Sequence, residues 1–282
     1  MNMLEDASRK GTLRDSAESA GSDKLGKTKS AGSADKMLAC RYEMKYLVTE
    51  SQAAAIAQFM RPYIQADRYC KLQRGGGYPI VSLYLDSENL RLCRESLEGH
   101  KNRYKLRIRS YTDEPDYPVF FEIKRRINTV IVKSRARVMH RDVPHLLAGL
   151  RLPPQNYNVD LDALNQFQLY VASIRARPTV LIRYMREAYE AQGESRVRVT
   201  FDRQLCYKVM HQAEVRLGGS GWQHNPYTMG TVIMEVKFTD CYPAWLDRMV
   251  KYFNLSARSV SKYATSLQDS SLLMFCAPYL AG

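Results

Sequence analysis

Residues 103–140 read RYKLRIRSYTDEPDYPVFFEIKRRINTVIVKSRARVMH, and this stretch decides the fold class. It contains three runs rich in apolar and charged residues, at approximately 103–111, 118–127 and 130–140, which are separated by turn-forming residues. Charged residues lie two positions apart within each run. Because residues i and i+2 of a strand point to the same face, each run is predicted to be a strand with one charged and one apolar face.

The same spacing recurs in segments that are far apart in the chain. Charged residues two positions apart occur in these groups: Glu43 and Lys45; Lys105, Arg107 and Arg109; Glu122 and Lys124; Lys133, Arg135 and Arg137; Arg196 and Arg198; Glu235 and Lys237. If these strands share one sheet, their charged faces converge. The shared surface would then hold eleven Lys or Arg and three Glu, which favours a polyanionic ligand.

The rest of the chain adds helices and further strands. Strands are predicted at Cys40–Val48, Ile80–Leu85, 179–190, 195–203 and 231–238, and helices at Glu50–Tyr63, after Asp86 or Ser87, at Leu161–Ile174, from Pro243 to about Phe253 and at Ser259–Gln268. This number of strands favours an antiparallel α+β domain. Closure of the sheet into an antiparallel β-barrel would remove exposed edges and turn the charged faces inward, with helices packed outside against the apolar faces.

The first 36 residues differ in composition from the rest. Residues 1–36 are rich in Ser, Ala, Gly, Lys and Asp and contain no aromatic residue, so a disordered N-terminal tail is expected. This tail holds seven Lys or Arg and six Asp or Glu, so +12 of the formal charge of +13 belongs to residues 37–282. The basic character is therefore a property of the expected folded domain, residues 37–282.

The cysteines and the hydropathy bear on the location of the protein. The six cysteines form no CxxC pair and no short Cys/His zinc pattern, which indicates reduced thiols and a cytoplasmic protein. No apolar stretch approaches the roughly 20 residues that a membrane span requires. The chain is therefore expected not to cross a membrane by itself, although a membrane protein partner could hold it at the inner face of the membrane.

The charged faces have a simpler explanation, because an antiparallel sheet commonly has one solvated face. The row Lys133, Arg135 and Arg137 argues against that explanation. A hairpin would place this row beside Glu122 and Lys124, and like charges opposite each other cost roughly 0.2–1 kcal/mol per pair. Such a one-sided excess of cations suggests that a ligand supplies the missing negative charge.

Phosphates are the ligand that this composition suits best. The guanidinium of Arg gives two parallel hydrogen bonds to phosphate, and Lys supplies a compact charge. An acid such as Glu235 could hold Mg²⁺ or Mn²⁺ against a triphosphate. Nucleic acid is the competing polyanion, but the chain has no RNP, zinc-finger or helix-turn-helix signal. The glycines at 75–77 are not followed by GKS or GKT, so they form no P-loop.

Seven short motifs follow one another along the chain: Arg41-Tyr-Glu-Met-Lys-Tyr46, Lys105-Leu-Arg-Ile-Arg109, Phe121-Glu-Ile-Lys124, Tyr184-Met-Arg186-Glu-Ala-Tyr189, Arg198-Val-Thr-Phe-Asp202, Met234-Glu-Val-Lys-Phe238 and Ser261-Lys262-Tyr263. This ordered set resembles the VTC domain, the polyphosphate polymerase domain within the triphosphate tunnel metalloenzyme superfamily. They cover most of residues 40–267. Each motif alone is weak, whereas seven in the family's order are specific.

The resemblance implies an antiparallel β-tunnel that binds a nucleoside triphosphate and a growing polyphosphate chain. It assigns phosphate contacts to Lys45, Arg107, Arg109, Lys124, Lys133, Arg186, Arg198, Lys237 and Lys262, with help from Ser261, and metal binding to Glu235. Arg135 or Arg137 could take the place of Lys133. The implied reaction moves the γ-phosphoryl group of ATP onto phosphate or polyphosphate, with Mn²⁺ or Mg²⁺ as cofactor.

One departure from the superfamily pattern bears on the activity. The broader superfamily often opens with Glu-x-Glu-x-Lys, whereas this chain has Arg41 in place of the first Glu, followed by Glu43 and Lys45. The change resembles the polymerase branch more than the triphosphatase branch. Two rivals stay open: a triphosphatase with the same fold, and a module that binds polyphosphate, inositol phosphates or nucleic acid without catalysis.

Overall fold

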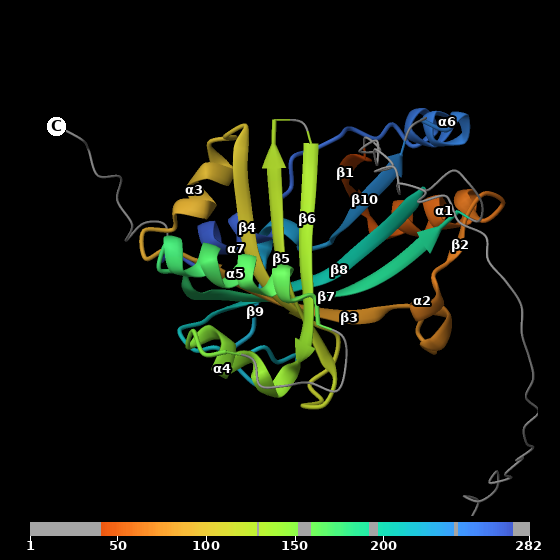
Figure 1. Cartoon of the computed structure of the whole chain (residues 1–282). Coiled ribbons are helices and arrows are strands. Elements are labelled where there is room, and N and C mark those ends of the chain that lie inside the picture. Colours follow the sequence, from red (N-terminus) through yellow and green to blue (C-terminus); the bar gives the residue numbers. More distant parts are fainter. Residues whose placement is uncertain (1–40, 129, 152–158, 192–196, 240–241, 273–282) are drawn as a thin grey trace, which may run out of the picture. The chain divides into compact units, whose positions relative to one another are not determined.

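The computed structural model describes residues 41–128, 130–151, 159–191, 197–239 and 242–272 (Figure 1). The tail predicted to be disordered, residues 1–36, lies outside these ranges. The strands are β1 (Arg41–Thr49), β2 (Gln65–Ala66), β3 (Tyr78–Asp86), β4 (Asn102–Ser110), β5 (Pro118–Ile127), β6 (Val130–Met139), β7 (Arg177–Glu190), β8 (Arg198–Val209), β9 (Gln223–His224) and β10 (Thr231–Thr239). The helices are α1 (Glu50–Met60), α2 (Arg68–Leu72), α3 (Arg91–Leu97), α4 (Val143–Leu147), α5 (Leu161–Ser173), α6 (Ala244–Tyr252) and α7 (Lys262–Asp269).

The strands form one antiparallel sheet in the order β1-β10-β8-β7-β3-β4-β5-β6, with β2 beside β7 and β9 beside β8. The predicted antiparallel α+β class is confirmed. The predicted hairpin also forms, because Lys124 faces Lys133 and Glu122 faces Arg135 across β5 and β6. Within the described residues, the hydrogen-bonded path ends at β1 and β6, so the sheet is curved but not closed into a barrel by strand pairing.

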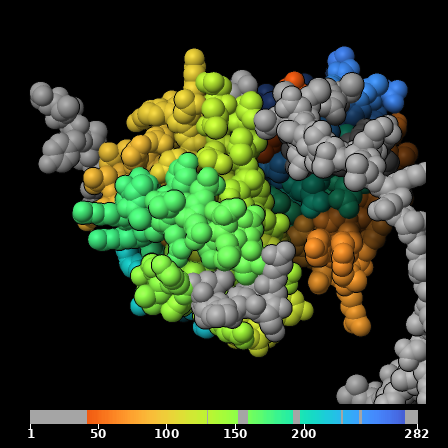
Figure 2. Space-filling view, viewed as in Figure 1, coloured from red at the N-terminus to blue at the C-terminus, as the bar shows by residue number. Residues whose placement is uncertain are grey.

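Helices cover the apolar face of the sheet at two places. Helices α4 and α5 pack on β3 to β6, where Phe167 of α5 meets Phe121 edge to face at a ring distance of 5.0 Å. Figure 2 shows α5 in green as a cover over this part of the molecule. Helices α1 and α6 cover β1, β8 and β10 with residues such as Ile56 and Leu246. The period-two alternation thus predicts which side chains enter these two cores.

Helix α7 lies on the opposite, inner face of the sheet, which also carries the charged side chains. Tyr263 of α7 stacks on Tyr84 of β3 at a ring distance of 4.7 Å, and Leu267 joins the same buried cluster as Tyr184 and Tyr207. The expectation that the helices pack outside is therefore wrong for α7. The physical reason is that the inner face is not uniformly charged, because tyrosines and aliphatic residues of β3, β7 and β8 give α7 an apolar surface.

A bulge in β8 explains why this strand continues beyond its predicted end near residue 203. Gln204 has a φ of +52°, and the pairing shifts between Arg183 and Met185 of β7. The extra residue reverses the alternation, so Asp202 before it and Leu205 after it both lie on the inner face. The strict period of two is lost at this point, and the second half of the strand could not be recognised from it.

The short elements α2, α4, β2 and β9 were not predicted, because two to five residues carry too little periodic pattern to identify. None of the helices that the structure describes is long and apolar enough to cross a membrane.

Candidate functional site

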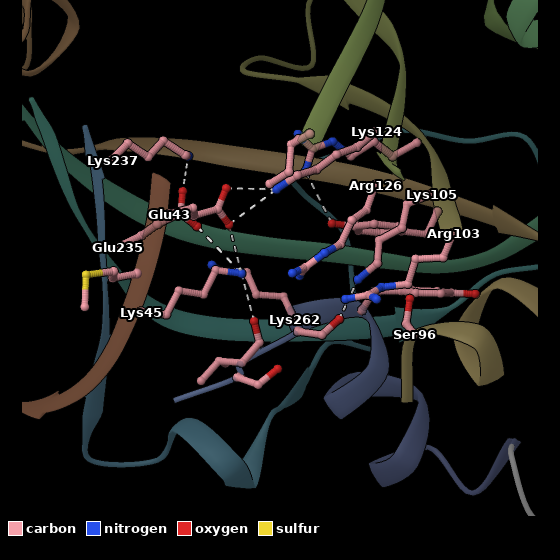
Figure 3. Close-up of a pocket in the computed structure, with 18 of the residues that line it drawn as sticks. Glu43, Lys45, Ser96, Arg103, Lys105, Lys124, Arg126, Glu235, Lys237 and Lys262 are labelled. Carbon is pink, nitrogen blue, oxygen red and sulfur yellow. Dashed lines mark hydrogen bonds and ion pairs between the residues drawn. The ribbon is translucent and has the colours of Figure 1, made fainter. Parts of the chain in front are cut away.

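The charged faces meet around a cavity of about 520 Å³ between β1, β10, β4, β5 and the segment before α7, residues 257–261 (Figure 3). Among the described residues, eleven Lys or Arg and two Glu line it: Lys45, Arg103, Lys105, Arg107, Arg109, Lys124, Arg126, Arg186, Lys237, Arg258 and Lys262, with Glu43 and Glu235. Figure 3 shows cations of β4 and β5 on one side and the side chains of β1 and β10 on the other.

Most of the residues predicted for the site come together in this cavity. They are Lys45, Arg107, Arg109, Lys124, Arg186, Lys237, Ser261, Lys262 and Glu235. They derive from β1, β4, β5, β7, β10 and the start of α7, so the curvature of the sheet brings together residues that are remote in sequence. For the strand residues, this convergence follows from the alternation, because each occupies the charged face of its strand, whereas Ser261 and Lys262 reach the cavity from the start of α7.

The other predicted residues lie outside the cavity lining. Arg198 contacts Asp67 at 2.8 Å and Glu190 at 3.1 Å, near the hydroxyl of Tyr78. Lys133 and Arg135 both contact Glu122. Each of these three cations is therefore paired with a carboxylate of the protein, and Lys133 and Arg135 share the single charge of Glu122.

A buried carboxylate, Glu122, sits at the centre of one ion-pair network. Its oxygens lie 2.6 Å from Nε of Arg107, 2.5 Å from Nζ of Lys133 and 3.3 Å from Nε of Arg135. Burial raises the pKa of Glu122, but the charges of Arg107, Arg109 and Lys133 outweigh burial and hold it well below its usual range. Glu122 therefore stays ionised and fixes the direction of Arg107.

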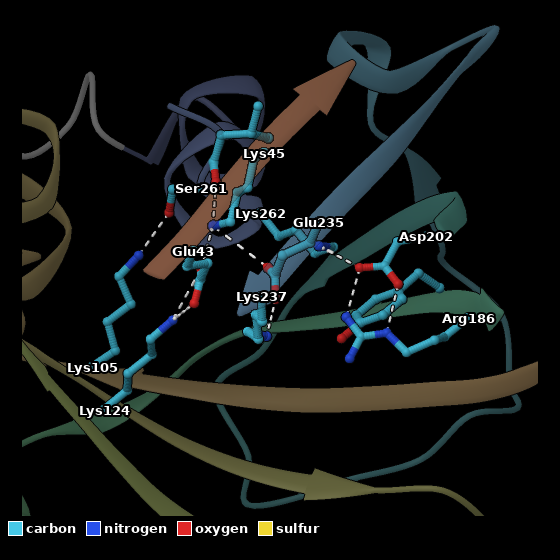
Figure 4. A network of polar contacts seen from close by, with 12 residues as sticks. Glu43, Lys45, Lys105, Lys124, Arg186, Asp202, Glu235, Lys237, Ser261 and Lys262 are labelled. Atoms are coloured by element: carbon cyan, nitrogen blue, oxygen red, sulfur yellow. Dashed lines mark hydrogen bonds and ion pairs between the residues drawn. The ribbon is translucent and has the colours of Figure 1, made fainter. Parts of the chain in front are cut away.

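A second buried carboxylate, Asp202, holds two cavity cations (Figure 4). Arg186 donates two hydrogen bonds of 2.7 Å to Asp202, and Nζ of Lys262 lies 2.7 Å from the same group. Burial raises the pKa of Asp202, but Arg186 and Lys262 lower it to about 2. The alternation places Asp202 on the charged face, but the sequence contains no signal that names its partners.

Two further carboxylates, Glu43 and Glu235, lie in the cavity on neighbouring strands. Glu43 contacts Lys45 at 3.2 Å and Lys124 at 3.0 Å, and Glu235 contacts Lys237 and, at 3.8 Å, Lys45. For Glu43, burial and the neighbouring Glu235 raise the pKa, but the three lysines together lower it to about 2. Burial also raises the pKa of Glu235, but Lys237 and Lys45 hold it well below its usual range, so both groups are anionic at neutral pH.

The donor set suits a divalent cation that is shared with a phosphate ligand. Within the described residues, no cluster of three His, Cys, Asp or Glu could hold a metal ion alone. Mg²⁺ and similar cations are commonly bound by one or two carboxylates together with substrate phosphates and water. Glu235 and Glu43 can supply those carboxylates, and their lysine neighbours can turn to the phosphates instead.

The segment before α7 closes the cavity on the side of β1 and β4. Ser261 caps α7 by accepting a hydrogen bond of 3.2 Å from the backbone N–H of Ala264, and its hydroxyl accepts another of 2.7 Å from Lys105. Lys45 donates to the carbonyl of Val260 at 2.9 Å. Two strands are therefore joined through this segment rather than through backbone pairing.

A lysine and a tyrosine that line the cavity have pKa values of about 8. Burial lowers the pKa of Lys105 to about 8, with Lys45 and Lys124 adding to this effect and Tyr84 opposing it. Burial raises the pKa of Tyr84, but Arg107, Lys105 and Arg109 outweigh burial and lower it to about 8. Tyr84 was not identified from the sequence, because a tyrosine in a strand is usually a core residue.

Fold and site together define the class: an α+β domain whose curved antiparallel sheet surrounds a cation-lined cavity suited to a polyanion. The chain belongs to the VTC domain family, which matches residues 40–270. This agrees with the resemblance carried by the seven motifs.

Comparisons with other proteins give weaker likenesses. A comparison with curated protein sequences found no match to this chain. Among solved structures, a protein of Bacillus halodurans provisionally assigned as an adenylate cyclase is similar with a TM-score of 0.42 and 12% identity, over 79% of this chain and 95% of that chain. A protein of Pyrococcus horikoshii is similar with a TM-score of 0.39 and 10% identity, over 81% of this chain and 99% of that chain.

Proposed function

We propose that this protein is a polyphosphate polymerase that transfers the γ-phosphoryl group of ATP onto phosphate or a polyphosphate chain and releases ADP. The observation that carries the proposal is the charge of the cavity, where eleven Lys or Arg accompany two Glu among the described residues. A set this one-sided needs several phosphates to neutralise it. In this proposal the curved sheet is the wall of a triphosphate tunnel.

The residues would act by alignment and by neutralisation of charge. Phosphoryl transfer needs the attacking and leaving oxygens in line, with the negative charge on the transferred group stabilised by cations. Arg107 and Arg186 are suited to this because Glu122 and Asp202 already fix their guanidinium groups. The acceptor phosphate is itself anionic, so no general base is required.

Mn²⁺ or Mg²⁺ is the proposed cofactor, with Glu235 as the main ligand and Glu43 beside it. A bound divalent cation would neutralise charge on the phosphates of ATP. Lys45 and Lys237 contact these carboxylates and would bind the phosphates that the metal does not cover. The proposed setting is the cytoplasm, where ATP is present, and a membrane protein is a proposed partner that would keep the enzyme at the inner face of the membrane.

A triphosphatase is the alternative that the same cavity could serve. It would use ATP or another triphosphate and transfer the phosphoryl group to water. The sequence disfavours it, because Arg41 stands where the broader superfamily often has an acid that could bind metal. A module that binds polyphosphate or inositol phosphates without turnover is the second alternative.

The test incubates the purified full chain with ATP and Mn²⁺ and separates the products by electrophoresis. A polymerase gives a ladder of polyphosphates together with ADP. Orthophosphate without a ladder would identify a triphosphatase, and tight, salt-dependent binding of polyphosphate without consumption of ATP would identify a binding module.

Two substitutions connect the activity to the cavity. Arg107→Ala and Glu235→Gln should each abolish the ladder, because one removes a fixed phosphate ligand and the other the main carboxylate for the metal. Arg61→Ala is the control, since Arg61 is exposed and does not line the cavity. Near-normal polymer synthesis by both cavity variants, with circular dichroism spectra like that of the parent, would contradict the proposed site.

A further inference from the structure

Three arginines at the exposed end of the cavity contribute to its charge but contact none of its carboxylates among the described residues. Arg103 lies near the start of β4, Arg126 stands directly opposite it on β5, and Arg258 comes from the segment between α6 and α7. All three line the cavity. Arg126 and Arg258 are exposed and Arg103 is half-buried, whereas Arg109 at the other end of the row is buried. Figure 3 shows Arg103 and Arg126 beside Lys105.

The cationic row on β4 is longer than a triphosphate. Arg103, Lys105, Arg107 and Arg109 occupy alternate positions of one strand and all line the cavity. At about 3.4 Å per residue, the row extends for roughly 20 Å from its first to its last Cα. Three linked phosphates are much shorter, so a triphosphate held by Arg107 and Arg109 leaves Arg103 without an anion.

Among the described residues, no carboxylate serves as a counter-ion at this end. Arg107 is paired with Glu122 and Lys124 with Glu43, but no ion pair of the described residues joins Arg103, Arg126 or Arg258 to a carboxylate. Arg103 donates to the carbonyl of His100, and Arg126 donates to that of Asn128 at 3.0 Å.

Arg103 and Arg126 also repel each other. They face each other across β4 and β5, where like charges are unfavourable. Burial and the neighbouring Arg126 both lower the pKa of Arg103. Two opposed arginines without an acid between them form a position that an anion would stabilise.

We propose that Arg103, Arg126 and Arg258 form a second phosphate-binding position, which holds the continuation of a linear polyphosphate chain beyond the phosphates bound deeper in the cavity. The inference rests on the proposed function for its ligand, a linear polyphosphate, but not on turnover. A nucleoside at this end would leave the arginines without a counter-charge, whereas a phosphate chain carries a charge on every unit and suits the paired donors of Arg. This position makes the affinity depend on chain length.

The test compares tripolyphosphate with a polyphosphate of about ten units by calorimetry, without nucleotide, at several salt concentrations. The variant Arg103→Gln/Arg126→Gln should bind the longer chain at least about tenfold more weakly than the parent, while its affinity for tripolyphosphate changes less than about twofold. The dependence of the longer chain's affinity on salt should fall by about one to two in the logarithmic slope. The matched control Arg61→Gln/Arg74→Gln removes two exposed arginines outside the cavity lining and should bind both ligands normally.

Equal weakening of both ligands in the cavity variant, or an unchanged affinity for the longer chain, would overturn the proposal. If the double variant does not fold, the single variant Arg258→Gln tests the proposal instead, because Arg258 lies in a connecting segment. This variant should bind the longer chain more weakly and tripolyphosphate as the parent does. The outcome is separate from that of the polymerase assay. A protein that never consumes ATP could still show the dependence on chain length, and a polymerase could lack it.

Discussion

Buried carboxylates set the directions of the cavity's arginines before any ligand arrives. Asp202 accepts two hydrogen bonds from Arg186 and also contacts Lys262. Glu122 accepts a hydrogen bond from Arg107 and also contacts Lys133. A cation fixed in this way needs little reorganisation when phosphate binds. These carboxylates are therefore positioning residues for the proposed reaction.

Replacement of Asp202 by Asn should destabilise the protein and weaken its binding of phosphate. Arg186 and Lys262 would be left buried without their counter-ion, a change that typically costs about 3–5 kcal/mol. Urea unfolding measures the loss, and Asp162→Asn, at an exposed position, is the control. Added tripolyphosphate should stabilise the Asp202→Asn protein more than the parent, because its phosphates replace the missing negative charge. A variant as stable as the parent would contradict this role.

The affinity for tripolyphosphate should fall as the pH rises from about 7 to about 9. Both Lys105 and Tyr84 have a pKa of about 8, so each loses a proton in this range and the cavity becomes less positive. The measurement is calorimetric binding at constant ionic strength. The variant Lys105→Met/Tyr84→Phe should bind more weakly at pH 7 but with a flatter dependence on pH. An affinity of the parent protein that stays constant or rises would contradict the titration of these groups in the cavity.

At the level of single residues, the sequence predicts which face a charged side chain occupies but not which partner it meets. The alternation puts Lys45, Arg107 and Glu235 on the face that lines the cavity, because each lies in an uninterrupted strand. It could not show that Arg198 would be held by Asp67, since that contact joins segments 131 positions apart. Lys105 shares the alternation with Arg107, but only the fold places it against Ser261.

Two elements shape the cavity in ways that periodicity does not reveal. The bulge at Gln204 turns Asp202 and Tyr207 to the same side of β8, although residues five positions apart lie on opposite faces of a regular strand. Helix α7 packs on the inner face because Tyr84 and Tyr184 provide an apolar surface there. The amphipathic pattern predicts a helix at Ser259–Gln268, but it does not identify the face of the sheet that receives it.

Removal of the hydroxyl at the start of α7 should affect both the helix and the cavity. Ser261→Ala loses the N-cap of α7, which should lower the free energy of unfolding by about 0.5–2 kcal/mol. It also removes the acceptor for Lys105 and should weaken the binding of tripolyphosphate. Urea unfolding and calorimetry measure the two effects. Ser261→Thr keeps the hydroxyl and should retain most of both properties, so equal behaviour of the Ala and Thr variants would contradict the role of this contact.

For the whole molecule, ion pairs and the segment before α7 bring distant strands together around the cavity. The pair between Glu43 and Lys124 joins β1 to β5, which lie far apart in the order of the sheet. Lys105 and Lys45 each contact the segment before α7. The sequence predicts a sheet with a charged face, but strand order and closure depend on pairing between remote strands, for which alternation carries no information.

The central claim is that the γ-phosphoryl group of ATP becomes part of a polyphosphate chain. Phosphorus NMR of the purified chain with ATP and Mg²⁺ follows this transfer directly, because interior phosphates of a chain resonate apart from orthophosphate and from ADP. The account predicts that ADP and chain phosphate appear in equal amounts, while orthophosphate does not accumulate. Orthophosphate released in step with ADP, without an interior chain signal, would contradict it.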